Sequence, residues 1–155
     1  MKIFAWTTAL ASDASYQYRI KAPLVELAYQ ELATVTIGDN LYGHDGANVV
    51  INHHLSHPDF LSAWTSLDDQ ALLVVEHDDD YLNLRTDHPT FRTGMTRADY
   101  EAFGRQAVLD SLQAADLVTV SVPHLAELYR EHTDTPIVVL PNTVDEVLFE
   151  VPQRV

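Results

Sequence analysis

The chain has no cysteine and only two lysines among its 155 residues. Without cysteine it can form neither a disulfide nor a thiolate metal site. Its formal net charge of -14 argues against a basic surface that binds a nucleic-acid backbone. No apolar run is long enough to span a membrane, and the first apolar run is too short for a signal peptide. These absences predict a cytoplasmic protein with no transmembrane segment and no nucleic acid bound through a basic surface.

Short apolar runs alternate with helical patterns along the sequence. A hydrophobic content of 46% and a charged content of 21% are ordinary for a globular domain of this length. The pattern predicts a doubly wound, Rossmann-like α/β fold: a mostly parallel sheet of about six strands with helices on both faces. The expected strands are residues 2–6, 33–38, 47–52, 71–75, 117–122 and 137–140, and the expected helices are residues 19–32, 58–67, 97–114 and the segment from Pro123. In such sheets, ligands bind beyond the carboxyl ends of the strands.

Residues 115–149 read as one βαβ unit followed by an exit from the sheet. This stretch resembles the end of the N-terminal domain in retaining glycosyltransferases of the GT-B fold, family four in type. In that family a strand reading D-x-V-x-x-x-S leads into a helix, and the next strand ends in P-N-G-V-D-x-x-x-F. The matching residues are Asp116, Val118, Ser121, Pro141, Asn142, Val144, Asp145 and Phe149, and the one departure is Thr143 at the usual glycine.

The resemblance implies a two-domain enzyme of which this chain supplies one half. Residues 1–149 would be the acceptor-side N-terminal domain, and residues 150–155 a tail or the start of an interdomain linker. The donor nucleotide-sugar would bind mainly to a C-terminal domain that this sequence does not contain. The expected function is sugar transfer from a nucleotide-sugar to an acceptor hydroxyl, with little or no activity from this chain alone. Asn142, at the exit, is an expected substrate-binding residue.

A second resemblance lies between the first strand and the first helix. Residues 7–18 form an expected loop that includes Ser12, a candidate for substrate binding, and that lacks the glycines of a dinucleotide fingerprint. Bacterial and phage-type glycosyltransferases have Y-R-x-x-x-P-x-x-x-L here, matched by Tyr18, Arg19, Pro23 and Leu27. Tyr18 and Arg19 would then bind a phosphate or a sugar hydroxyl. In the alternative, Arg19 pairs with a surface acid and Tyr18 packs against the protein.

Three histidines follow the third expected strand. His53, His54 and His57 invite a metal hypothesis, because neutral imidazole is a common ligand. No HExxH pattern is present, however, and adjacent His53 and His54 on a strand would point to opposite faces. We therefore expect His53 and His54 to line a polar, substrate-binding cleft or to cap a helix.

The fourth expected strand runs into five titratable residues, Glu76 to Asp80. His77 is a further candidate for substrate binding, and Asp78, Asp79 and Asp80 are the candidate catalytic residues. The phage-type GT-B group has a similar D-D-D stretch, whose acids would face the acceptor without a metal and could orient or deprotonate its hydroxyl. In a GT-A transferase, Asp78 and Asp80 would instead hold Mn²⁺ or Mg²⁺ on the donor diphosphate. The third possibility is a solvated acidic loop with Tyr81 and Leu82 beneath it.

Residues 83–96 have no periodicity and predict a long loop that could act as a lid. The loop and its border contain Arg85, Arg92 and Arg97, which could screen the acids. Thr96 and Asp99 predict a capping box at the start of the 97–114 helix. The alternative to a transferase half is a stand-alone α/β binding module.

Overall fold

The computed structural model describes residues 1–9, 13–53, 57–93 and 95–142, and all structural statements below concern these residues. Six strands form one sheet in the order β2-β1-β3-β4-β5-β6, and every neighbouring pair is parallel. This confirms the predicted Rossmann-like α/β class. The strands are β1 (Lys2–Thr7), β2 (Thr34–Gly38), β3 (Val49–His53), β4 (Leu72–His77), β5 (Leu117–Val120) and β6 (Ile137–Val139).

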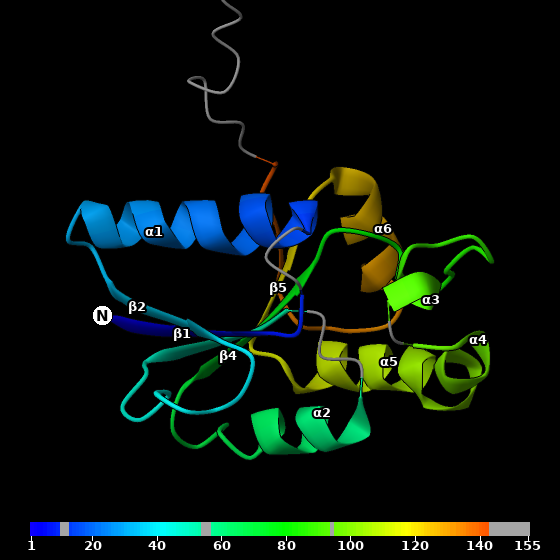
Figure 1. Ribbon diagram of the computed structural model, residues 1–155, viewed down its shortest axis with the longest axis horizontal. Helices are drawn as coiled ribbons and strands as arrows, with labels where there is room; N and C mark the ends of the chain where they lie inside the picture. Colours follow the sequence, from blue (N-terminus) through cyan, green and yellow to red (C-terminus); the bar gives the residue numbers. More distant parts are fainter. Residues whose placement is uncertain (10–12, 54–56, 94, 143–155) are drawn as a thin grey trace, which may run out of the picture.

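Helical segments connect the strands in chain order, except that residues 39–48 join β2 to β3 without a helix. The helical segments are η1 (Tyr16–Lys21), α1 (Ala22–Tyr29), α2 (Pro58–Thr65), α3 (Thr90–Thr93), α4 (Arg97–Asp99), η2 (Tyr100–Gly104), α5 (Arg105–Ala114) and α6 (Pro123–Arg130), of which η1 and η2 are π-helical turns. Figure 1 shows α1 on one side of the sheet and α2 with α5 on the other. Within the described part of the chain, no helix has both the length and the apolar character needed to cross a bilayer.

The alternation of side chains along β1 separates two hydrophobic cores. Ile3 and Ala5 pack with Ile20 and Leu24 under η1 and α1. Phe4 and Trp6 face the opposite way, into the larger core beneath α2, α5 and α6. The largest buried side chains of these three helices are Trp64, Leu112 and Tyr129. Each contributes roughly 1.5–3 kcal/mol through burial, so this face supplies most of the hydrophobic stabilisation.

The strand order places a switch point between β1 and β3. From β1 the chain crosses to β2 on one side, and from β3 onward it proceeds through β4, β5 and β6 on the other side. A crevice opens where the direction of winding reverses, and ligands of open α/β sheets bind there, beyond the carboxyl ends of the strands. The carboxyl ends of β1 and β3 are therefore the first place to look for a site.

Two local expectations from the sequence were wrong. The first helical segment begins within the expected loop, because Tyr16 to Tyr18 belong to η1. The expected 83–96 loop contains the short helix α3. Within α2, Leu61 and Trp64 are buried, whereas Phe60 is exposed and its ring lies 5.7 Å from the ring of Trp6.

The helical stretch that follows Met95 begins as predicted. Thr96 accepts a hydrogen bond from the Asp99 amide and Asp99 caps the Thr96 amide in return, so the capping box is confirmed. The π-helical turn η2 then ends at Gly104, which Met95 covers closely. A Cβ at position 104 would lie 2.9 Å from the Met95 sulfur. Glycine at this position leaves room for the Met95 side chain to lie against the helix.

Candidate site at the carboxyl edge of the sheet

Four polar side chains lie in register across the carboxyl ends of β1, β3, β4 and β5. They are Thr7, His53, Glu76 and Thr119, and each is paired with the next across the sheet. In-register neighbours point to the same face, which here is the face beneath η1 and α1. Their exposed fractions are only 4%, 0%, 3% and 6%. We call these four residues the polar row. Burying so many polar groups is costly unless they are paired.

His53 holds the centre of the polar row through both ring nitrogens. Its Nδ1 lies 2.7 Å from Thr7 Oγ1, and its Nε2 lies 3.0 Å from Ser15 Oγ. The backbone amide of Ala9 donates to the same Thr7 oxygen at 3.1 Å. These contacts fix the imidazole plane, and they connect the row to Ser15, a partly buried hydroxyl just before η1.

Glu76 is neutralised by Arg19, which reaches it from η1. The guanidinium Nε and Nη2 lie 2.6 and 2.5 Å from Glu76 Oε1, and both side chains are 4% exposed. Glu76 Oε2 is 3.7 Å from His53 Nε2. Arg19 Nη1 donates to the Leu140 carbonyl and to Asn142 Oδ1. Three Arg19 nitrogens thus serve the protein itself, and the partner acid is buried rather than on the surface.

Residues 76–80 do not form a single acidic loop, which was one of the possibilities that the sequence left open. Glu76 and His77 belong to β4 and are buried on opposite faces of the sheet. The His77 ring contacts the rings of Tyr81 and Tyr129, with centroid distances of 5.4 and 5.2 Å and interplanar angles of 46° and 45°. Its surroundings are therefore aromatic.

Asp78 and Asp80 stabilise the turn that follows β4. Asp78 Oδ1 accepts a 2.9 Å hydrogen bond from the Tyr81 hydroxyl. Asp80 Oδ1 accepts from the amides of Leu82 and Asn83, both at 3.1 Å. Carboxylates that accept backbone amides two and three residues ahead build turns of this kind. Leu82 is buried beneath the turn as the loop hypothesis predicted, and Tyr81 is partly buried.

Asp79 is the exposed member of the acidic triplet. Its side chain is 56% exposed, and its Oδ2 lies 3.0 Å from His88 Nε2. The Thr90 amide donates to His88 Nδ1 at 3.2 Å, so neutral His88 carries its proton on Nε2 and donates it to Asp79. Asp79 Oδ1 accepts the Asp80 amide at 2.8 Å, so both carboxylate oxygens have a partner in the loop, and only their remaining lone pairs can accept from solvent or a ligand.

Tyr81 and Tyr129 brace the loop as neutral phenols. Burial, followed by the charge of Asp78 and the hydrogen bond to it, raises the pKa of Tyr81 far above its ordinary value. Burial likewise raises the pKa of Tyr129, whose hydroxyl donates to the Asp79 carbonyl at 2.7 Å. Both hydroxyls therefore remain donors throughout the neutral pH range.

Arg85 and Arg97 do not screen the acids of the triplet, although the sequence allowed that role. Arg85 pairs with Asp87 at 3.2 Å on the surface, and Arg97 pairs with Glu101 at 2.7 Å. The Arg92 side chain lies outside the described part of the structure. Glu76 is paired instead with Arg19, and Asp79 with the imidazole of His88.

The described residues form no cluster that would support either metal hypothesis. These residues contain no group of three or more histidine, aspartate or glutamate side chains placed to hold a metal ion. His53 is buried in the polar row, whereas His57 is exposed and caps α2 by accepting from the Asp59 amide at 3.3 Å. Ser12 and His54, two predicted substrate-binding residues, lie outside the described residues.

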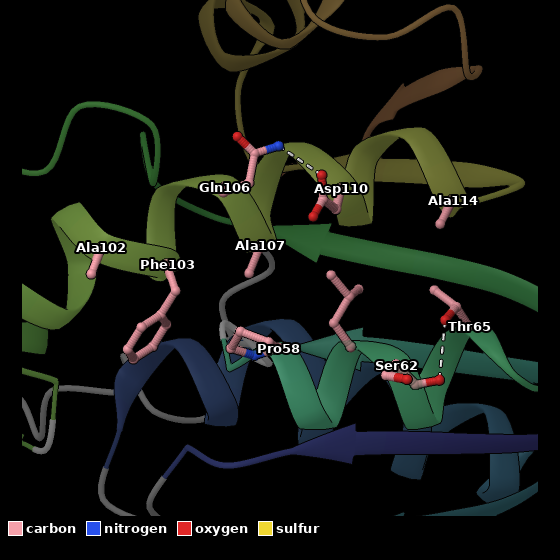
Figure 2. Close-up of a pocket in the computed structure, with 10 residues that line it drawn as sticks. Pro58, Ser62, Thr65, Ala102, Phe103, Gln106, Ala107, Asp110 and Ala114 are labelled. Atoms are coloured by element: carbon pink, nitrogen blue, oxygen red, sulfur yellow. Dashed lines mark hydrogen bonds between the residues drawn. The ribbon is translucent and has the colours of Figure 1, made fainter.

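A groove lies on the opposite side of the sheet from the polar row. It is a groove of about 480 Å³ between α2 and the η2–α5 helix, and Figure 2 shows Phe103 and Gln106 on one wall and Pro58 and Ser62 on the other. None of the catalytic or substrate-binding residues predicted from the sequence lines this groove. Comparison of the chain with protein-family models, curated proteins and solved structures finds no match.

The structure adds Thr7, Ser15 and Glu76 to the residues that the sequence singled out. A signal for two of them was present, because β1, β3 and β4 each end in a residue pair that contains a polar side chain: Trp6-Thr7, Asn52-His53 and Glu76-His77. Adjacent residues on a strand point to opposite faces, so one residue of each pair had to enter the same face. Ser15 carried no comparable signal, because it depends on where the helical segment begins.

Proposed function

We propose that this chain is the acceptor-side domain of a nucleotide-sugar-dependent glycosyltransferase. One observation carries the proposal. The two segments that resemble glycosyltransferases, Tyr18-Arg19 and Pro141-Asn142, meet at the polar row through the contact of Arg19 with Asn142 Oδ1 at 3.3 Å. These residues are 123 positions apart in the chain. Their meeting point lies beyond the carboxyl ends of the strands, where α/β sheets bind ligands.

The groups around this point suit an acceptor rich in hydroxyls. Ser15 offers the hydroxyl that contacts His53, and Tyr18, which precedes Arg19 in η1, offers the phenol of a residue that is 37% exposed. Asn142 accepts from Arg19 through its oxygen, so its amide NH₂ is the part that can donate to a ligand. A sugar hydroxyl is both donor and acceptor, and mixed groups of this kind can satisfy it.

Asp79 is the acid best placed to handle a proton. In the proposed reaction, the acceptor oxygen bonds to the sugar C1 and the bond from C1 to the phosphate oxygen breaks. The leaving diphosphate takes the electron pair, and the acceptor proton passes to the carboxylate. Asp78 and Asp80 support this role by fixing the turn on either side of Asp79. The nucleotide-sugar would be held by a second domain.

The proposal is tested by titrating the ¹⁵N-labelled chain with glucose, mannose and N-acetylglucosamine, and separately with UDP-glucose and GDP-mannose. We expect amide shifts at Thr7, Ser15 and Asp79 with at least one free sugar and none of that size with the nucleotide-sugars. An assay with radiolabelled UDP-glucose should show no transfer by this chain alone. Tight nucleotide-sugar binding or turnover by the isolated chain would overturn the acceptor-half proposal.

A stand-alone binding module is the second candidate. It is favoured by the engagement of Arg19, Asp78 and Asp80 within the protein, which leaves few groups for chemistry. The intact mass of the native gene product separates the two. A mass well above 17.4 kDa favours the transferase half, whereas a mass of 17.4 kDa favours the binding module. Loss of nucleotide binding in EDTA would instead favour the metal-dependent transferase with Asp78 and Asp80.

A further inference from the structure

We propose that Arg19 is a positioning residue that holds the chain leaving β6 against the polar row. Its guanidinium joins three places that are distant in sequence: its own turn η1, Glu76 at the end of β4, and the Leu140–Asn142 exit. The role proposed for Asn142 in ligand binding rests on the proposed function. The positioning itself does not.

The two ends of this link differ in surroundings. Glu76 and Arg19 are almost completely buried, so their ion pair is shielded from salt and cannot exchange partners with water easily. Leu140 and Asn142 are exposed. β6 is only three residues long and pairs only with β5 within the described residues. A buried charge pair thus anchors an exposed segment that has few contacts of its own.

The geometry also separates this role from anion binding. A guanidinium that receives a phosphate needs two N–H groups directed at the ligand. In Arg19, Nε and Nη2 are directed at Glu76, and Nη1 is directed at Leu140 and Asn142. Binding an anion would require the buried carboxylate to lose its partner, which is strongly unfavourable. The Nε–H resonance of Arg19 should therefore not move when inorganic pyrophosphate is added.

The experiment follows hydrogen exchange at the Leu140 amide, which donates to the Val120 carbonyl at 2.8 Å and so reports on the exit. Four variants are compared with the wild type: Arg19→Gln, Glu76→Gln, the double variant Arg19→Gln with Glu76→Gln, and Asn142→Ala. Arg97→Gln is the matched control, because it removes an arginine–glutamate pair on the surface. Urea unfolding of every variant reports the global free energy of unfolding.

The double variant distinguishes positioning from simple stabilisation. Removing both members of a buried ion pair costs much less stability than removing one, so the double variant should unfold at a urea concentration near that of the wild type. It still lacks the Nη1 donor, so exchange at Leu140 should stay about tenfold faster or more, the effect expected from losing a charged hydrogen bond. Arg97→Gln should change neither quantity.

Two results would overturn the proposal. One is unchanged exchange at Leu140 in the double variant. The other is an equal acceleration of exchange in β1 and β3, which would mean that Arg19 only stabilises the whole sheet. Asn142→Ala keeps the test decisive if Arg19→Gln does not fold, since it leaves the buried pair intact and should accelerate exchange at the exit alone. Failure to bind any sugar would count against the proposed function and leave this result untouched.

Discussion

The polar row and the acidic loop of residues 78–80 lie at the same edge of the sheet, but their charged groups differ in burial and in partners. In the row, Glu76 is buried, and Arg19 and His53 lie beside it at short distances. In the loop formed by Asp78, Asp79 and Asp80, all three carboxylates accept hydrogen bonds from the backbone or from neighbouring side chains, and Asp79 is the most exposed of them. The loop is conspicuous in the sequence because its acids are consecutive. The row is assembled from four strands, and its electrostatic interactions are stronger because water is excluded.

The largest expected effect comes from Glu76→Ala. This variant leaves the Arg19 guanidinium buried without its carboxylate. Breaking one side of a buried ion pair typically costs about 3–5 kcal/mol. Urea unfolding should therefore show a strongly destabilised protein. If Glu76→Ala lost no more stability than Asp79→Ala, the contrast between the row and the loop would be wrong.

His53→Leu should have the next largest effect. Leucine fills a similar space but leaves the Thr7 and Ser15 hydroxyls without their shared partner, and each unsatisfied buried group costs about 1–3 kcal/mol. We expect a total loss of about 2 kcal/mol, because Ser15 is only partly buried and can turn to water. His57→Leu is the matched control on the exposed N-cap of α2, and its effect on urea unfolding should be below 1 kcal/mol.

A pH titration tests the loop side of the comparison. The pKa of Tyr81 and of Tyr129 is raised in the folded state, so the neutral phenols contribute stability that is fully present below their unfolded pKa of about 10. That stability should be lost as the pH rises above about 10. Urea unfolding from pH 8 to 11 should show this decline, and it should be shallower in Tyr81→Phe. An unchanged slope would mean that Tyr81 ionises as freely in the folded chain as in the unfolded one.

The smallest effects should come from the acids themselves. Asp80→Ala removes an acceptor of two backbone amides and should cost about 1 kcal/mol. Asp79→Asn keeps the shape and one acceptor oxygen at an exposed position, so its stability should change by less than about 0.5 kcal/mol. In the sugar titration, however, Asp79→Asn should weaken binding more than Asp80→Ala. The reverse order would place the ligand-facing acid at Asp80.

The sequence predicted the sheet well because each strand carries its own apolar run, and Pro58, Thr96 and Pro123 mark helix starts independently of distant residues. It predicted the site less well because the polar row depends on strand order. Glu76 can lie buried at the end of a strand because Arg19, 57 positions away in the sequence, neutralises its charge. The role of Asp80 in accepting backbone amides of the turn could be recognised only once the turn to Asn83 was known. The pairing of Arg19 with the exit at Asn142 depends on the same long-range arrangement.

The short length of β6 also affects how the sheet ends. Within the described residues β6 is an outermost strand, and the unpaired backbone groups of such a strand can recruit a strand from another molecule. The strand is only three residues long. The Leu140 amide, immediately after it, donates to the Val120 carbonyl on the β5 side and so adds no donor to the open edge. A foreign strand would therefore find few consecutive partners to align on.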